Sequence, residues 1–205
     1  TDPKSFIYSR SLGQDPVTTG EFVAGVCNVM AQNGISGILK HFPGYGNNTD
    51  THVGIAIDDR SLDELETGDL IPFVKGIDAG AKAIMVSHTF VNCLDTEYPA
   101  SLSPAVIEYL RNTMGFGGVV ITDWWMQKSK SPEFPNIKDN AYRVRAQVDV
   151  LMPGDMGHLN KKYKSDGTLL KTLGKPEGMT RAELQRTAKS VLQLILKTRK
   201  EDVRK

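Results

Sequence analysis

The sequence has few of the features that mark membrane proteins, nucleic-acid-binding proteins or small disulfide-rich proteins. Its 205 residues contain only two cysteines, Cys27 and Cys93, both in apolar-leaning stretches. This predicts two buried thiols, with neither a disulfide framework nor a metal site. Lys and Arg total 25 against 24 for Asp and Glu, so no excess positive charge is available to attract nucleic acid. No stretch approaches the roughly 18 consecutive apolar residues that a membrane helix needs. We therefore expect one soluble globular domain, for which 40% hydrophobic residues is an ordinary content.

Short apolar runs alternate with helix-like segments along the chain. Helix starts are predicted where Ser or Thr is followed three residues later by Glu, or directly by Pro. The expected helices cover residues 22–30, begin at Ser61, Pro72 and Ser103, and cover residues 141–146 and 180–198. The expected strands are residues 6–8, 35–39, 83–86, 118–121 and 148–152. Near-continuous apolar strands that alternate with helices are typical of a parallel sheet covered by helices.

Each expected strand is followed by polar side chains. These are Arg10, the pair Lys40-His41, His88, Asp123 and Asp155. A (β/α)₈ barrel gathers such side chains at one face, whereas an open sheet concentrates them in one crevice, so the pattern favours a barrel. Five strands are fewer than the eight of a complete barrel. We therefore expect residues 1–205 to be the C-terminal part of a (β/α) barrel domain, with about five βα units.

Residues 40–52 form the most polar of these strand ends. They read Lys-His-Phe-Pro-Gly-Tyr-Gly-Asn-Asn-Thr-Asp-Thr-His. Proline and glycine end the strand, and the loop then presents Lys, His and Asp side chains suited to acid–base chemistry or polar recognition. An ordinary surface loop that contains two histidines would have the same composition. Motifs elsewhere in the chain distinguish the two interpretations.

Four further motifs occur in order around this loop. Residues 8–16 read Tyr-Ser-Arg-Ser-Leu-Gly-Gln-Asp-Pro, residues 85–88 Met-Val-Ser-His, residues 99–103 Pro-Ala-Ser-Leu-Ser, and residues 118–123 Gly-Val-Val-Ile-Thr-Asp. Together with residues 40–46 and the Asp50-x-His52 pair, this ordered set resembles glycoside hydrolase family 3, specifically its β-N-acetylglucosaminidase branch. The resemblance covers roughly residues 6–154. It implies a retaining exo-β-glycosidase that acts on a carbohydrate, most simply a β-N-acetylhexosaminidase.

The resemblance also implies roles for individual residues. Asp123 matches the catalytic nucleophile, and Asp50 and His52 match the acid/base dyad of the acetylglucosaminidase branch. The ligands of the sugar hydroxyls are matched by Arg10, Lys40 and His41. Retaining hydrolysis needs one carboxylate that forms a covalent glycosyl-enzyme and a second group that protonates the leaving oxygen. A histidine can supply the second function near neutral pH, with a neighbouring carboxylate orienting its ring.

For two further residues, His88 and Trp124, the sequence does not distinguish binding of the sugar from internal packing. His88 could line the sugar site or form a satisfied internal contact. Trp124 could offer a face on which a sugar stacks, but an aromatic residue after a strand is as often part of the core. The glycines of the loop are expected to let His52 move toward the sugar. The resemblance implies no metal and no organic cofactor.

The sequence departs from the family pattern at two positions. Tyr45 stands where the family's acetylglucosaminidases often have histidine, and Trp124 stands where they usually have a second acidic residue. Thr122-Asp123-Trp124 instead looks like the β-glucosidase branch, so glucose is an alternative sugar. The early strands of the barrel, with the family's early aspartate, are absent from the sequence.

Two consequences follow from those absent strands. The chain could instead be a non-catalytic remnant that binds carbohydrate without hydrolysing it, which is a different class of function from an enzyme. The open edges of the sheet predict association with a separate segment that carries the missing strands, or self-association. Neither nucleic acid nor a membrane is an expected partner, and the cellular compartment stays open between the cytoplasm and secretion.

Overall fold

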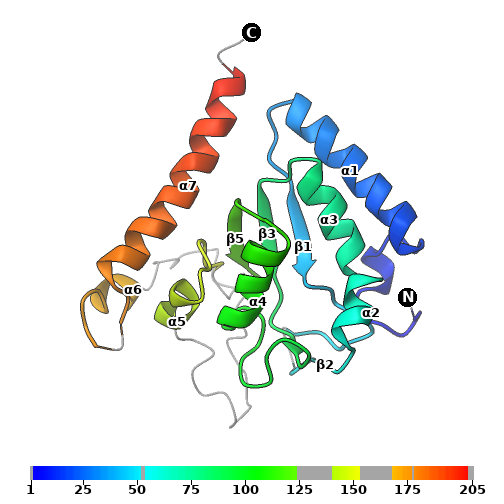
Figure 1. The fold of residues 1–205 in the computed structure, drawn as a ribbon, viewed down its shortest axis with the longest axis horizontal. Helices are drawn as coiled ribbons and strands as arrows, with labels where there is room; N and C mark the ends of the chain where they lie inside the picture. Colours follow the sequence, from blue (N-terminus) through cyan, green and yellow to red (C-terminus); the bar gives the residue numbers. More distant parts are fainter. Residues whose placement is uncertain (1, 52–53, 124–139, 153–167, 177, 203–205) are drawn as a thin grey trace, which may run out of the picture.

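The core of the protein is a three-stranded parallel sheet covered by helices (Figure 1). A computed structural model of the chain describes residues 2–51, 54–123, 140–152, 168–176 and 178–202. The strands are β1 (Ile38–Phe42), β3 (Ala83–Val86) and β5 (Val119–Thr122), in the order β1-β3-β5. All four residues of β3 are buried, as the central strand of a sheet covered on both faces requires.

Two helices lie side by side next to this sheet (Figure 1). Helix α1 (Pro16–Gln32) begins with Asp15, whose carboxylate accepts the backbone N–H groups of Val17 and Thr18 at 2.9 and 3.0 Å. Helix α3 (Leu70–Asp78) follows the short helix α2 (Leu62–Glu66). The expected capping box at the start of α2 is confirmed: Ser61 and Glu64 bond each other's backbone N–H groups at 3.2 and 2.8 Å.

The strand-to-strand connection from β3 to β5 runs through α4 (Pro104–Glu108), which continues as the π-helical turn η2 (Tyr109–Thr113). Ser103 is the predicted cap, and its hydroxyl accepts the N–H of Val106 at 3.1 Å. The hydrophobic core lies between α3, the sheet and this helix. Its fully buried members include Phe42, Leu65, Ile84, Val86, Val106, Ile107, Leu110 and Val120. Full burial of such a side chain contributes about 1.5–3 kcal/mol relative to exposure.

The expected strands are confirmed at 83–86 and, shifted by one residue, at 118–121, but the other three need correction. The strand expected at 35–39 runs instead from Ile38 to Phe42, because the N–H of Ile35 still bonds the Met30 carbonyl at the end of α1. The strand expected at 6–8 is wrong. Tyr8–Arg10 form the 3₁₀ helix η1, and the N–H of Tyr8 bonds the Ser5 carbonyl locally instead of a neighbouring strand.

The strand expected at 148–152 is reduced to one bridge. Val150 lies parallel to Ile121, beyond the β5 edge of the sheet. Among the described residues, the main sheet therefore has three strands rather than the expected five, and it does not close into a barrel. The strand β1 forms its other edge.

A second, two-stranded parallel sheet was not predicted. It joins β2 (Ile57–Asp58) to β4 (Phe90–Val91). The N–H of Phe90 bonds the Ala56 carbonyl at 2.9 Å, and the N–H of Asn92 bonds the Asp58 carbonyl at 3.0 Å. These bonds hold the long loop after β1 against the loop after β3.

The C-terminal part contains α5 (Asn140–Arg145), α6 (Thr168–Lys171) and the long helix α7 (Arg181–Asp202). The predicted capping box of α7 is confirmed, because Thr180 and Glu183 bond each other's backbone N–H groups at 2.7 and 3.2 Å. Helix α6 was not predicted. Across the described parts of the chain, no helix is both long enough and apolar enough to span a bilayer.

Both cysteines are free thiols. Cys27 is buried in α1, as predicted, whereas Cys93 is only half-buried. Burial raises the pKa of both thiols.

Candidate active site

The carboxyl ends of the three strands lie level with one another. The parallel register places Phe42, Val86 and Thr122 side by side. Beyond these residues the ladder continues, because the N–H of Ser87 bonds the Phe42 carbonyl and the N–H of Asp123 bonds the Val86 carbonyl, each at 3.0 Å. Polar residues that directly follow the strands are thereby brought together at the carboxyl-terminal end of the sheet.

His41 and Asp123 meet at this carboxyl-terminal end of the sheet. The Nε2 atom of His41 lies 3.4 Å from an Oδ atom of Asp123, and each residue is 6% exposed. A buried carboxylate is costly unless charged or hydrogen-bonding groups compensate it, and a protonated imidazole at this distance can do so. The structure thus joins two of the site residues that the sequence predicted.

Tyr45 lies against His41 from the loop that follows β1. The two rings meet edge to face, with centroids 5.3 Å apart at 70°. The tyrosine ring also packs on Phe6, with centroids 5.7 Å apart at 41°. The Tyr45 hydroxyl accepts the N–H of Thr51 at 3.0 Å and lies 3.0 Å from its Oγ1.

Burial raises the pKa of the Tyr45 phenol, and the nearby carboxylates of Asp50 and Asp123 act in the same direction, while the hydrogen bonds with Thr51 oppose them. The phenol therefore keeps its proton at neutral pH. Because its oxygen accepts the Thr51 N–H, its own proton is available to the Thr51 hydroxyl. The half-buried Asp50 precedes Thr51 directly.

The loop after β1 is also held by a pair of ionic contacts. The guanidinium of Arg60 bonds both oxygens of Asp58 at 2.7 and 2.9 Å and both oxygens of Asp69 at 2.9 and 3.1 Å. These two carboxylates raise the pKa of Arg60 above its already high ordinary value. Bidentate pairs of this kind fix geometry as well as charge.

The two loop glycines allow the backbone to approach these groups. Gly44 has φ +147°, and a Cβ atom there would lie 2.1 Å from an Asp69 carboxylate oxygen. Gly46 has φ +56°, and its Cβ would lie 3.0 Å from the Arg60 guanidinium. Glycine is required here for close approach and positive φ, which is a different reason from the loop movement that the sequence suggested.

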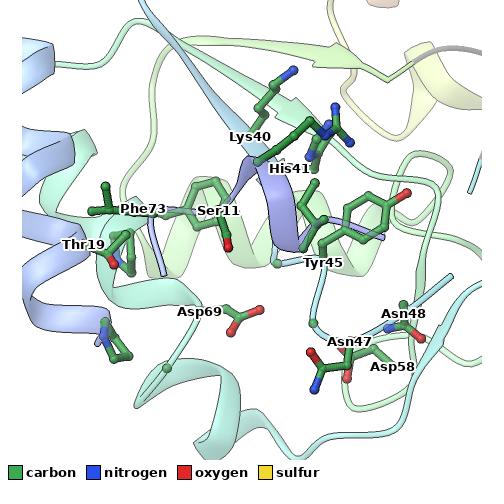
Figure 2. Close-up of a pocket in the computed structure, with 18 of the residues that line it drawn as sticks. Ser11, Thr19, Lys40, His41, Tyr45, Asn47, Asn48, Asp58, Asp69 and Phe73 are labelled. Carbon is green, nitrogen blue, oxygen red and sulfur yellow. The ribbon is translucent and has the colours of Figure 1, made fainter. Parts of the chain in front are cut away.

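Arg10 and Lys40 lie beside this loop on an open cleft of about 1310 Å³. The cleft runs between η1, α1 and the segment from β1 to α3, and Figure 2 shows Lys40, His41 and Tyr45 along one side of it and Asp69 on another. The Arg10 guanidinium lies 5.0 Å from the centre of the Phe6 ring. Asp123 is not part of this lining, but it contacts His41, which is.

His88 is placed differently from these residues. It is 4% exposed, and its Nδ1 lies 2.7 Å from the Ser101 hydroxyl, which is itself fully buried. The structure thus shows an internal contact of the kind that one of the two interpretations expected. Its binding of substrate stays a prediction.

Two predicted site residues, His52 and Trp124, lie outside the described residues, as does Asp155. Within the described residues, no group of three or more His, Cys, Asp or Glu side chains could hold a metal ion. Sequence reasoning noted Tyr45 only as a departure and did not find Arg60. The two acidic residues directly before Arg60, Asp58 and Asp59, were the only local signal for the ionic contacts, and nothing local indicated Asp69 as the second partner.

The family of the chain follows from its sequence match. Residues 1–194 match the model of the glycosyl hydrolase family 3 N terminal domain. The chain belongs to glycosyl hydrolase family 3. The similar proteins include a β-hexosaminidase of Stenotrophomonas maltophilia (strain K279a), 44% identical over 119 residues that make up 57% of this chain and 35% of that protein. A β-hexosaminidase of Xylella fastidiosa (strain M23) is 43% identical over 119 residues, which again make up 57% of this chain and 35% of that protein. The matched part thus spans about a third of these family 3 relatives.

Solved family 3 structures share the fold. A β-N-acetylglucosaminidase of Paenibacillus sp. (strain FPU-7) superposes with a TM-score of 0.82 at 24% identity, covering 96% of this chain and 38% of that one. The β-N-acetylglucosaminidase of Thermotoga maritima superposes with a TM-score of 0.70 at 26% identity, covering 91% and 40%. The described sheet therefore belongs to the TIM-barrel type of this family.

Proposed function

We propose that the protein is, or is part of, a retaining exo-β-glycosidase, and specifically a β-N-acetylhexosaminidase. The contact of His41 with Asp123 at the carboxyl ends of the strands supports this proposal most directly. Active sites of barrel enzymes lie at this face. The β-hexosaminidases among the similar proteins support N-acetylglucosamine as the sugar.

In the proposed mechanism, Asp123 attacks the anomeric carbon of the bound sugar while the bond to the leaving oxygen breaks. His52 donates its proton to that oxygen, and Asp50 orients the imidazole and stabilises its charged form. The imidazole then takes a proton from water, and the resulting nucleophile releases the sugar from Asp123 with overall retention. Arg10, Lys40 and His41 bind sugar hydroxyls, and both His88 and Trp124 border the sugar.

The nucleophile can be identified chemically. A fluorinated slow substrate with an activated leaving group, its fluorine placed away from the 2-acetamido group, slows both steps of a retaining glycosidase and lets the covalent intermediate accumulate. Mass spectrometry after digestion should find the added sugar on the peptide that contains Asp123. An adduct on any other peptide would refute the assignment.

A second experiment tests the acid/base residue. His52→Ala should slow the hydrolysis of substrates with poor leaving groups far more than that of activated aryl glycosides, which depart with little protonation. Asp50→Asn should follow the same pattern more weakly. Equal losses on both substrate types would show that His52 is not the acid.

The sugar could also be glucose, because Thr122-Asp123-Trp124 resembles the β-glucosidase branch. A β-glucoside phosphorylase superposes with a TM-score of 0.80 at 21% identity, covering 94% of this chain and 36% of that one. This likeness concerns the fold alone. Rates on the paired nitrophenyl glycosides of N-acetylglucosamine and glucose discriminate the two sugars. Sugar binding without turnover of either would favour a non-catalytic remnant.

We further propose that this (β/α) unit, the C-terminal part of a barrel domain, associates with a segment that carries the missing strands, or with itself. Apolar side chains are exposed on α1, at Phe22 and Val29, on β1, at Ile38, and on α7, at Leu192 and Leu196. Exposed apolar surface and an unpaired strand edge both favour association. Light scattering of residues 1–205, together with a glycosidase assay, tests this. A monodisperse, active monomer would contradict it.

A further inference from the structure

Tyr45 connects two parts of the candidate site that come from distant points in the sequence. Its ring packs on His41, which contacts the carboxylate of Asp123. Its hydroxyl bonds Thr51, the residue between Asp50 and His52. A continuous set of contacts therefore runs from Asp123 to the segment that carries the proposed dyad.

These contacts are short and shielded from water. Tyr45 is 5% exposed and Thr51 is fully buried. The hydroxyl of Tyr45 accepts one hydrogen bond from the Thr51 backbone and is paired with the Thr51 hydroxyl at the same distance of 3.0 Å. Two hydrogen bonds to one residue restrict both its distance and its orientation, and leaving either group unpaired inside the protein is unfavourable.

The ring itself is held by two aromatic neighbours. Phe6 and His41 both contact it, and the adjacent glycines lie against Asp69 and Arg60. A rigid ring that carries a buried hydroxyl is suited to set the position of the next loop segment. Placement of a catalytic group matters because an error of about 1 Å can slow a reaction roughly a hundredfold.

We propose that Tyr45 is a positioning residue, which fixes Asp50 and Thr51 relative to Asp123 through its hydrogen bonds to Thr51. This inference rests on the proposed roles of Asp123 and the dyad, and it deepens them. Tyr45 does not exchange a proton with the substrate in this scheme. It holds Asp50, the carboxylate proposed to orient the acid/base residue, in place while the leaving oxygen departs.

Tyr45→Phe tests the proposal, because it keeps the ring contacts and removes only the hydroxyl. The expected result is a loss of kcat/KM of about ten- to hundredfold for substrates with poor leaving groups, and a much smaller loss for activated aryl glycosides. Thr51→Val, which keeps the backbone N–H but removes the hydroxyl, should cause an intermediate loss. Thr51→Ser should behave like the unchanged protein.

Tyr109→Phe is the matched control. The Tyr109 hydroxyl donates to the Glu66 carboxylate at 2.6 Å, away from the site, so its removal should leave the ratio of the two substrate classes unchanged. Equal losses on both classes in Tyr45→Phe would reduce Tyr45 to a structural role and overturn the proposal.

A measurement without substrate separates this proposal from the proposed function. Amide hydrogen exchange at Thr51 should become faster in Tyr45→Phe and stay unchanged in Tyr109→Phe. Unchanged exchange at Thr51 would overturn the positioning role even if the protein is active. Absence of turnover in the unchanged protein even together with the segment that carries the missing strands, with faster exchange in Tyr45→Phe, would instead refute the proposed function while the positioning role stands.

Discussion

Two aspartates at opposite ends of the sheet, Asp123 and Asp149, are buried to the same extent, each 6% exposed. Asp123 follows the last residue of β5 and lies against His41. Asp149 lies near the start of β5, where its carboxylate accepts the Val120 N–H and the Arg111 guanidinium, each at 2.9 Å. The same guanidinium also bonds the carbonyls of Phe116 and Gly118.

The difference shows that burial of a carboxylate does not by itself indicate chemistry. The surroundings of Asp149 belong to the scaffold: a strand amide and an arginine that also holds the turn before the strand. Asp123 faces a histidine at the edge where the loops carry the other predicted site residues. The position on the sheet and the identity of the partners therefore distinguish a structural carboxylate from a proposed nucleophile.

The largest expected effect is the loss of turnover in Asp123→Ala. In the complete enzyme, kcat should fall by about 10³-fold or more, because loss of a nucleophile removes the covalent step. The melting temperature should change little. A variant that keeps substantial activity would place the nucleophile elsewhere.

Asp149→Ala should have the opposite profile. It leaves the Val120 amide and the Arg111 guanidinium without their buried acceptor, which should lower the free energy of unfolding by about 3 kcal/mol. Urea denaturation measures this loss. The turnover of the folded fraction should be preserved. A loss of activity greater than the loss of folded protein would show that Asp149 is not purely structural.

A smaller effect concerns pH. Burial raises the pKa of Asp149 against the opposing contributions of Val120 and Arg111. The folded protein therefore retains this proton at a pH where the unfolded chain, with a pKa of about 4, has released it. The stability contributed by Asp149 should decrease as pH rises from about 4 through the raised pKa, and then level off.

Asp149→Asn keeps an acceptor without titrating and is the reference for this measurement. Urea denaturation of both proteins between about pH 3 and 7 gives the difference in unfolding free energy. A difference that grows in favour of the unchanged protein as pH rises would contradict the raised pKa.

The smallest effect is expected at an exposed carboxylate. The hydrogen bonds from Ser61 lower the pKa of Glu64, so the stability that its charge contributes is present above about pH 4.3 and lost as pH falls through the lowered pKa. Glu64→Gln can still form a capping box, and its stability should converge with that of the unchanged protein in acid. Thermal unfolding of both proteins across this pH range measures the convergence.

Local patterns predicted much of the fold. The capping boxes at Ser61 and Thr180 depend on residues three positions apart, and the strand at 83–86 is apolar throughout. The pairing of β2 with β4 escaped prediction because two-residue strands carry almost no pattern and depend on long-range hydrogen bonds. The strand expected at 6–8 failed because Tyr8 already belongs to the 3₁₀ helix η1, where its N–H bonds the Ser5 carbonyl.

The sequence predicted the reactive residues of the site better than the contacts that hold them in place. The resemblance indicated His41 and Asp123, and the structure brings them together. It gave no indication that Tyr45 would bond Thr51, or that Arg60 would bond Asp69 nine residues away. Such contacts depend on the path of the loop in space, which the spacing of residue types does not encode.

The contacts of Gly44 with Asp69 and of Gly46 with Arg60 bear on how this loop could be exchanged between barrels. A graft of residues 41–51 alone would carry a backbone shaped to fit a guanidinium and two carboxylates that the recipient lacks. Asp58, Arg60 and Asp69 would have to move with it, and position 44 could accept no side chain without displacing Asp69. The transferable module is thus discontinuous in sequence, and its boundary lies at the start of α3 rather than at the end of the loop.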